Sequence, residues 1–419
     1  MACSVPGVKG IRWNIIVTLK QRITSRSRRV GLPQSTVWAM SAACGISVAN
    51  IYYNQPLLFY MGDSFHATQR QIGYLPGISQ AGVAIGMFAF VPLGDMLPRR
   101  LLIVWVAVAC AFAAVFTATA GTLKLLYFAG FLTGVTNIVP HLILPLAAKL
   151  AAPERRGRVL GHVLGGLLSG ILLARVVSGL VATAFGWRAM YWGAAALMLS
   201  LSVAMRFVLP EELPDDDLPE RGVRYGALLR SIAELVRTQP ILREASLEGA
   251  MLFGAFSSFW STLVFLLATP PYHYGSSVAG LFGVVGLAGA FVAPVAGRLS
   301  DRKGPGYTVA LGIGISLLSY LIFGLFGYKF WGLVLGVLLL DVGVQGGHVA
   351  NQTRIYALVP EARSRLNTVY MVSYFLGGSL GSVLGAYGWQ RAGWSGVCAA
   401  GGVQLSVAAA VRWARRNRW

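Results

Sequence analysis

Long apolar stretches dominate this sequence and decide what it can fold into. A helix that crosses the hydrocarbon core of a bilayer needs about 20 mostly apolar residues. Twelve such stretches follow one another between residues 36 and 411. The chain of 419 residues is 56% hydrophobic and 12% charged, whereas about 25% charged residues is usual for soluble proteins. The sequence therefore predicts an all-α membrane protein and argues against a soluble enzyme or a disordered chain.

The twelve expected spans form two groups of six. The first group is 36–58, 71–93, 101–119, 125–150, 159–183 and 190–209, and the second is 246–268, 278–297, 307–326, 331–356, 367–388 and 393–411. The polar stretch between the groups contains one short amphipathic pattern at 227–237, which predicts a surface helix. The expected domains are a basic N-terminal tail (1–33), a first half (34–209), a linker (210–245), a second half (246–413) and a C-terminal tail (414–419).

The basic residues are distributed very unevenly between the two sides of these spans. Of the 35 Lys and Arg residues, 29 lie in the tails and in the loops on one side, 5 lie on the other side, and Arg175 alone lies inside a span. Basic loops stay in the cytoplasm, so both termini are expected there, in a multi-pass protein of a bacterial-type inner (cytoplasmic) membrane. The formal charge of +20 is thus a topology signal, and we expect no nucleic-acid partner.

Part of the first half is repeated in the second. Residues 153–158 (PERRGR) correspond to residues 360–365 (PEARSR), 207 positions later, and the same offset aligns His141 with His348. Internal repeats are typical of secondary transporters, whose substrate sites lie near the middle of the membrane where the halves meet.

Two loops on the expected cytoplasmic side carry a related pattern. Residues 297–304 (GRLSDRKG) match the G-x-L-x-D-R-x-G loop of the major facilitator superfamily, and residues 93–100 (LGDMLPRR) are a weaker copy. The sequence after residue 34 resembles this superfamily, which implies twelve helices in two pseudo-symmetric six-helix halves. The resemblance also implies gating residues, which are Gly297, Asp301, Arg302 and Gly304 in one loop and Asp95, Arg99 and Arg100 in the other.

Three further segments are similar to the proton-driven drug and sugar efflux branch of that superfamily. They are residues 49–56 (ANIYYNQP), 170–175 (GILLAR) and 348–354 (HVANQTR). This resemblance implies a proton-coupled antiporter that exports a small organic molecule by alternating access. An uptake symporter or facilitator for a nutrient and a non-transporting membrane sensor stay open as alternatives.

Catalytic chemistry has no visible basis in the sequence, which lacks a P-loop, a nucleophile–base arrangement and metal-ligand spacing. We expect no enzyme, no cofactor and no metal. The expected partners are a small-molecule substrate, protons and the lipid bilayer, and the expected functional unit is a monomer.

Ionisable residues inside membrane spans are costly and usually functional. Asp341 lies about ten residues, or about 15 Å, into the tenth span, where a desolvated carboxylate can hold a proton at neutral pH. Arg175 keeps its charge and needs a partner or a water-filled cavity, and Asp341 or an anionic group of the substrate could be that partner. Histidine side chains ordinarily titrate near neutral pH, so His348 suits a proton relay. These three residues are the candidates for proton coupling.

Other polar residues in the spans are candidates for a substrate cavity. They are Asn50, Asn54, Asn137, His141, Asn351 and Gln352. Glu248 is expected at the start of the seventh span, where a carboxylate favours a helix N-terminus. Two small-residue pairs, Gly161/Gly165 and Gly377/Gly381, predict close helix packing.

Overall fold

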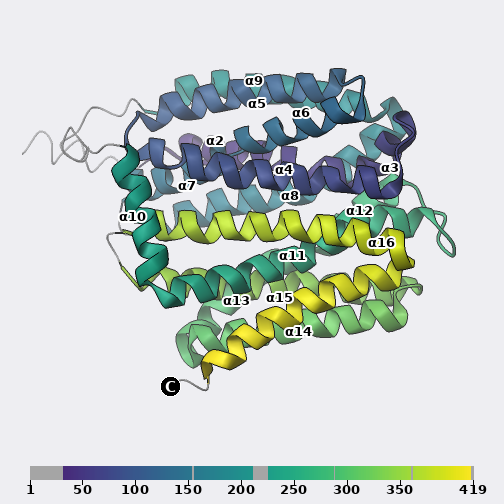
Figure 1. Ribbon diagram of the computed structural model, residues 1–419. Helices are drawn as coiled ribbons and strands as arrows, with labels where there is room; N and C mark the ends of the chain where they lie inside the picture. The colour runs from purple at the N-terminus through teal and green to yellow at the C-terminus, as the bar shows by residue number, and fades with distance from the viewer. Residues whose placement is uncertain (1–31, 153–154, 211–224, 287, 360–361, 417–419) are drawn as a thin grey trace, which may run out of the picture.

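The computed structural model describes residues 32–152, 155–210, 225–286, 288–359 and 362–416, and it is all-helical over these ranges (Figure 1). Most helices run between two ends of one bundle. One end carries α10 (Tyr225–Thr238) and the C-terminal end of the described chain, and we call it the linker end. The opposite end is called the far end. The expected tail 1–33 lies almost entirely outside the described residues, as do most of the acidic part of the linker and residues 417–419.

The helices on either side of α10 form two sets. The first set is α2 (Gln34–Tyr52), α3 (Asn54–Ser64), α4 (Gln69–Phe90), η1 (Pro92–Asp95), α5 (Arg99–Thr119), α6 (Leu123–Thr136), α7 (Val139–Leu150), α8 (Arg156–Phe185) and α9 (Trp187–Val208). The second set is α11 (Pro240–Ala268), α12 (Ser276–Gly286), α13 (Ala288–Lys303), α14 (Pro305–Phe326), α15 (Phe330–Tyr356) and α16 (Arg363–Arg416). The position of α10 agrees with the surface helix predicted at 227–237.

Nine of the described helical segments are individually long and apolar enough to cross a membrane. The last of them, α16, contains two spans, because Ala392 and Gly393 are not helical. Gly393 has φ 56°, a left-handed conformation that glycine adopts without steric cost. The pairs α2/α3 and α12/α13 supply the two remaining spans, which gives the twelve that the sequence predicts.

Several spans are interrupted in ways that the sequence only partly predicts. Pro56 removes one backbone hydrogen bond of the first span, and α2 gives way to α3 just before it, at Tyr53. The fourth span was expected to be one continuous helix, which is wrong, because it divides into α6 and α7 at Asn137. The Asn137 amide nitrogen donates to the Ser47 carbonyl oxygen at 2.8 Å, so a contact with α2 holds the chain at this break.

Close helix packing occurs at one of the two predicted glycine pairs. A Cβ atom on Gly377 or Gly381 would lie 2.1 or 1.9 Å from a carbonyl oxygen of α11, so these positions require glycine. The prediction is wrong for Gly161 and Gly165, where a Cβ atom would meet nothing within 4 Å. On the same helix, Gly170 makes the close contact instead, against Gly45 of α2.

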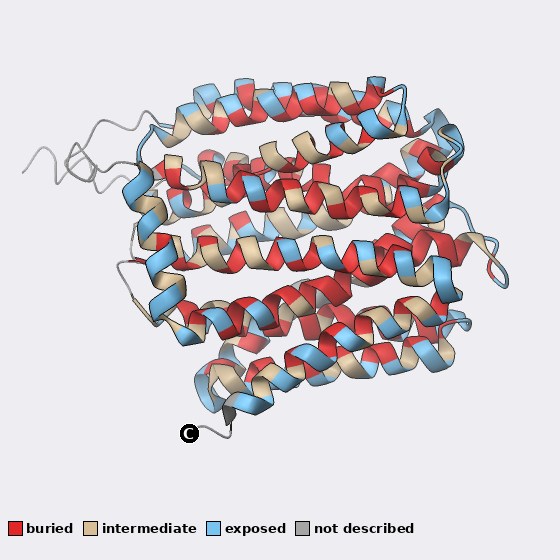
Figure 2. Ribbon diagram, in the orientation of Figure 1, coloured by how far each residue is buried: buried red, intermediate tan, exposed pale blue. Residues whose placement is uncertain are grey.

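The surface and the interior of the bundle differ as expected for a protein surrounded by lipid. Figure 2 shows buried residues on the faces that helices turn toward one another and exposed residues on the outside. Large apolar side chains are strongly exposed there, including Phe207 and Phe185 at 80% and 78%. In contrast, almost all of α11 is buried, so this helix lies at the centre of the bundle.

The two halves pack against each other mainly at the far end and in the middle of the bundle. At the far end, Gln69 of α4 accepts a hydrogen bond from Trp389 of α16 at 2.6 Å, and Arg70 donates to Gln390 at 3.0 Å. Nearer the middle, Ser257 of α11 donates to Gln80 of α4 at 3.2 Å. These contacts tie α4 to α11 and α16 over their far-end halves.

Candidate functional site

Arg175 lies in the middle of the bundle, inside a cage built from both halves of the chain. Its guanidinium carbon is 4.0 Å from the ring centroid of Trp260 and 4.8 Å from that of Tyr52. The ring of Phe256 is 5.8 Å away, and Arg175 Nε donates to Gln55 Oε1 at 2.9 Å. We call Arg175, Gln55, Tyr52, Phe256 and Trp260 the arginine cage. A guanidinium is attracted to aromatic faces, which explains how this buried charge is partly stabilised.

Two donors of the arginine cage have no hydrogen-bond acceptor. Arg175 is 3% exposed, and its Nη2 atom is buried with no hydrogen-bond partner. The indole nitrogen of Trp260 is also buried and unsatisfied. Most buried polar groups in proteins have a partner, so two neighbouring exceptions mark this cage as a candidate site.

Asp341 lies on α15 close to the cage. An added Cβ on Gly286 of α12 would be 3.2 Å from Asp341 Oδ1 and 3.4 Å from the Trp260 ring, which places the carboxylate and the indole around one glycine. Asp341 is 6% exposed, and its Oδ2 atom is buried without a hydrogen-bond partner. Arg175 and Asp341 lie within electrostatic range of each other. Within the described part of the chain, however, no ion pair of 4.0 Å or less joins them.

His348 and His141 approach each other across the two halves, as their matching positions in the repeat suggest. They lie within electrostatic range of each other. His348 Nδ1 is 3.0 Å from the hydroxyl oxygen of Tyr370, and its ring centroid is 4.7 Å from that of Tyr374. The ring centroids of His141 of α7 and Phe375 are 6.1 Å apart, and the two rings are nearly perpendicular. His348 lies closer to the linker end than Asp341 does, because it is two helical turns further along α15. His141 lies near His348 and therefore also on the linker-end side of Asp341.

The asparagines of the first half mostly connect helices. Asn137 bonds to Ser47, and Asn50 donates to the carbonyl oxygens of Ile46 and Ser47 in its own helix. Asn54 donates to Ser79 Oγ at 3.4 Å. The carbonyl oxygens of the Asn50 and Asn54 side chains remain buried and unsatisfied, so these two residues still offer acceptors.

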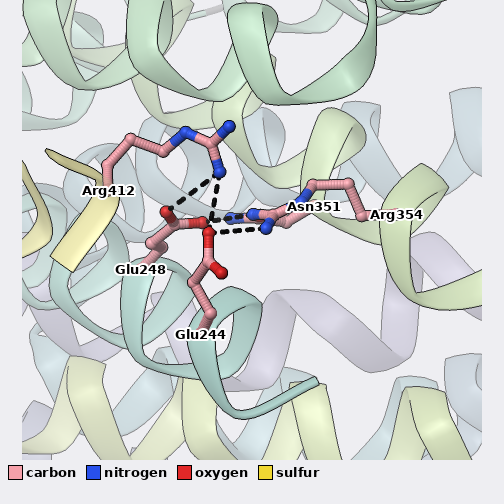
Figure 3. A network of polar contacts seen from close by, with 5 residues as sticks. All are labelled: Glu244, Glu248, Asn351, Arg354 and Arg412. Carbon is pink, nitrogen blue, oxygen red and sulfur yellow. Dashed lines mark hydrogen bonds and ion pairs between the residues drawn. The ribbon is translucent and has the colours of Figure 1, made fainter. Parts of the chain in front are cut away.

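A buried charge network that the sequence analysis did not predict lies at the linker end of the second half (Figure 3). Arg354 of α15 donates to Glu244 at 2.6 Å and to Glu248 at 2.7 Å, and Arg412 of α16 donates to Glu244 at 2.7 Å. Arg354 also donates to Asn351 Oδ1 at 3.0 Å. We call Glu244, Glu248, Arg354 and Arg412 the charge network. The network brings two carboxyl groups together with two guanidinium groups.

The expectation for Glu248 is wrong because the seventh span begins earlier than predicted. α11 starts at Pro240, so Glu244 is helical rather than part of a linker, and Glu248 lies two turns inside the helix. Its side chain is completely buried, which a carboxylate tolerates only with charged or hydrogen-bonding partners. Pro240 at the first helical position and the i, i+4 spacing of the two glutamates are the signals that could have shown this network.

The two remaining cavity candidates lie near the charge network. Asn351 accepts from Arg354, while its own amide nitrogen is buried without a partner. Gln352 donates to Asn367 at 3.5 Å. Neither residue contacts Arg175 or Asp341, so the structure does not gather the cavity candidates into one group.

The residues expected to act in gating lie in different settings in the two loops. Gly297, Asp301 and Arg302 belong to α13, which continues to Lys303, and Gly304 forms the following turn with φ 86°. Asp301 therefore lies in the last turn of α13 and is exposed, rather than capping the next helix.

In the other loop, Arg99 Nε donates to the Gly94 carbonyl oxygen at 2.9 Å. Arg100 donates to the carbonyl oxygen of Arg206, and the Asp95 side chain lies outside the described structure.

Comparison with known proteins agrees with this architecture. The model of the Major Facilitator Superfamily matches residues 40–381 and 281–418. The uncharacterized transporter YgaY of Escherichia coli O157:H7 is 40% identical over 382 residues, covering 91% of this chain and 96% of the relative. A Streptomyces coelicolor protein named as a transporter is 36% identical over 375 residues, covering 88% of this chain and 86% of the relative.

A solved structure shares the fold. It is a bacterial homologue of the human lysosomal transporter Spinster in an inward-facing and unoccupied conformation, with a TM-score of 0.70 at 16% identity. The alignment covers 90% of this chain and 95% of that chain. The family match, the bacterial relatives and the twelve spans agree that this is a multi-pass transporter of the inner membrane, and the chain belongs to the major facilitator superfamily.

Proposed function

We propose that this chain is a proton-coupled secondary active transporter for a small organic molecule. The observation that carries the proposal is the pair formed by Asp341 and Arg175 at the junction of the halves. Each has a buried polar atom without a hydrogen-bond partner, and the two charges lie near each other without direct contact. A carboxylate that gains and loses a proton in such a place changes the charge of the site by one unit.

The distribution of contacts between the halves supports alternating access. The far end is held closed by the contacts of Gln69 and Arg70 with α16. We propose that the linker end is the cytoplasmic end, as the 29 basic residues on that side favour. Rocking of one half against the other would break the far-end contacts and expose the arginine cage and Asp341 to the other side.

The charge network is proposed to hold one half together during this motion. All four of its side chains come from α11, α15 and α16, which belong to the same half. It therefore does not need to break when the halves move apart. His141 and His348 do come from opposite halves, and we propose that they line the path of the proton between Asp341 and the linker end.

Two directions of coupling are compatible with this site. Antiport with export of the substrate is favoured by the resemblance of residues 49–56, 170–175 and 348–354 to efflux proteins. Symport is favoured by the opposite charges of Asp341 and Arg175, because protonation of Asp341 leaves Arg175 available for an anion. The charge of the substrate decides between antiport and symport. A cationic substrate would compete with the proton for Asp341, which corresponds to antiport, whereas an anionic substrate would bind Arg175 when Asp341 is protonated, which corresponds to symport.

The proposal is tested by transport in proteoliposomes. Compounds that raise the melting temperature of the purified protein are first selected from a panel of metabolites and drugs. Each selected compound is then offered to proteoliposomes with and without an imposed pH gradient. We expect accumulation of at least one compound against its own gradient when the pH gradient is present. Transport that never exceeds equilibration, with either sign of pH gradient, would show a facilitator instead.

A further inference from the structure

The arginine cage differs from the other buried arginine site of this chain in having no acid in contact. In the charge network, Arg354 has two carboxylate oxygens within 2.7 Å. Arg175 is more deeply buried, yet no carboxylate of the described residues lies within 4.0 Å of it. Its Nε atom is bound by Gln55, and its face is covered by Trp260 and Tyr52. The site thus holds a buried positive charge whose Nη2 atom is buried without an acceptor.

A second donor lies beside the first. The Trp260 indole nitrogen belongs to the ring that stacks on the guanidinium, and it too has no acceptor. A carboxylate has two oxygens and accepts bonds from two donors, and it would also neutralise the charge. Both nitrogen atoms are buried in this conformation, so a ligand reaches them only when a neighbouring side chain moves aside.

We infer that the arginine cage is the receptor for an organic carboxylate with a flat apolar body, whose anionic head binds Arg175 and Trp260. This inference rests on the proposed transport function and names its substrate class. The aromatic walls supply apolar surface on which a flat body can stack, and both halves of the chain contribute to them. Binding to such a site would change as the halves move, which a transported substrate requires.

Asp341 would then link the proton to the anion. An ionised Asp341 competes with the carboxylate for the positive charge of Arg175, whereas a protonated Asp341 does not. Among the residues that the structure describes, Tyr52 on α2 and Tyr374 on α16 are further titratable groups within electrostatic range of this pair. His348 lies two turns further along α15. Proton and anion should therefore bind together, which corresponds to symport of an organic acid.

The test uses three probes of the same size and different charge, which are benzoate, benzamide and benzylamine. Binding to the full-length purified protein is measured by calorimetry and by the shift of the melting temperature. We expect benzoate to bind with a millimolar Kd and the other two to bind more weakly. Arg175→Gln should weaken benzoate at least about tenfold, since a charge-assisted hydrogen bond is lost. Arg175→Lys should retain part of the affinity, and Trp260→Phe should weaken benzoate because it removes the second donor.

The matched control is Arg188→Gln. Arg188 also lies over a tryptophan, with its guanidinium carbon 4.3 Å from the Trp187 ring, but it is exposed at the far end. This variant should bind benzoate as the parent protein does. Asp341→Asn should bind benzoate several-fold more tightly at pH 7.5, because it mimics the protonated acid.

Three results would overturn the inference. They are stronger binding of benzylamine than of benzoate, unchanged benzoate binding by Arg175→Gln, or no binding by any of the three probes. None of them would remove the proposed transport function, which is measured separately as accumulation driven by the pH gradient. If that accumulation is found for neutral or cationic compounds alone, the substrate class is wrong and the coupling proposal stands.

Discussion

Arg354 of α15 donates to the completely buried carboxylate of Glu248 of α11 at 2.7 Å, and this contact joins two helices of the second half. Removal of the Glu248 carboxylate leaves Glu244 to face both Arg354 and Arg412, so the network keeps an excess buried positive charge. Breaking a buried ion pair costs up to about 3–5 kcal/mol, and the remaining contacts with Glu244 reduce that cost. We therefore expect Glu248→Ala to lower the melting temperature of the purified protein by several degrees. Glu234→Ala on α10 is the control, because its side chain is exposed. Equal melting temperatures for the two variants would contradict this role of the charge network.

The topology prediction follows from the distribution of the basic residues. Reporter fusions at Asp217 and at the C-terminus should report the cytoplasm, whereas fusions after Asp63 and Tyr272 should report the periplasm. The measurement uses two reporters that are active on opposite sides of the membrane, such as alkaline phosphatase and green fluorescent protein. A C-terminus in the periplasm would be incompatible with cytoplasmic placement of the linker end.

The structure shows which parts of this fold the sequence could predict. The number and order of the spans are predicted, because about 20 apolar residues in a row are a strong signal by themselves. The break at Asn137 was not predicted, although Pro140 in the first turn of α7 removes a backbone hydrogen bond there and is a sequence signal for it. The hydrogen bond from Asn137 to Ser47 on another helix has no such local signal. Helix ends have a weaker sequence signal than helix centres. The predicted start of α11 was later than the observed start at Pro240, so Glu244 was assigned to the linker and Glu248 to a helix terminus.

The candidate site was predicted only in part for a related reason. Rare charges inside the spans identify Arg175 and Asp341 directly, and the repeat relates His141 to His348. The stacking of Trp260 on Arg175 depends instead on how α8 and α11, one from each half, pass each other. Nothing in the local sequence of either helix encodes that crossing, so Trp260 and Gln55 were not predicted to bind Arg175.

The two gating loops should differ in importance for transport. The loop at residues 297–304 keeps the full pattern, whereas the loop at residues 93–100 has lost several of its positions. We expect Asp301→Asn to reduce the transport rate more than Asp95→Asn does. Both variants are compared at equal amounts in the membrane, as determined by immunoblot. Equally mild effects would mean that neither carboxylate takes part in gating.

Arg175 should be sensitive even to a conservative substitution. Its planar guanidinium stacks on Trp260 and donates to Gln55 at the same time, and an ammonium group does not reproduce both contacts. We expect Arg175→Ala to abolish pH-driven accumulation and Arg175→Lys to restore only part of it. Arg188→Gln serves as the control and should transport normally. Full activity of Arg175→Lys would show that a positive charge alone is sufficient.

Asp341 should be essential for coupling rather than for folding. It is the only acid that the described structure places near the middle of a span and outside the charge network. Asparagine has nearly the same shape but cannot bind and release a proton, so Asp341→Asn should remain folded and should still bind substrate. Its transport should no longer respond to pH.

The decisive measurement is accumulation in proteoliposomes with and without a pH gradient. The parent protein should accumulate substrate only when the gradient is imposed, whereas Asp341→Asn should only equilibrate it, at a rate that does not change with the gradient. Exchange of labelled for unlabelled substrate at equal pH provides the control, since it requires binding and alternation but no net proton movement. If Asp341→Asn still accumulates substrate against its gradient, another group carries the proton, and His348 becomes the next residue to replace.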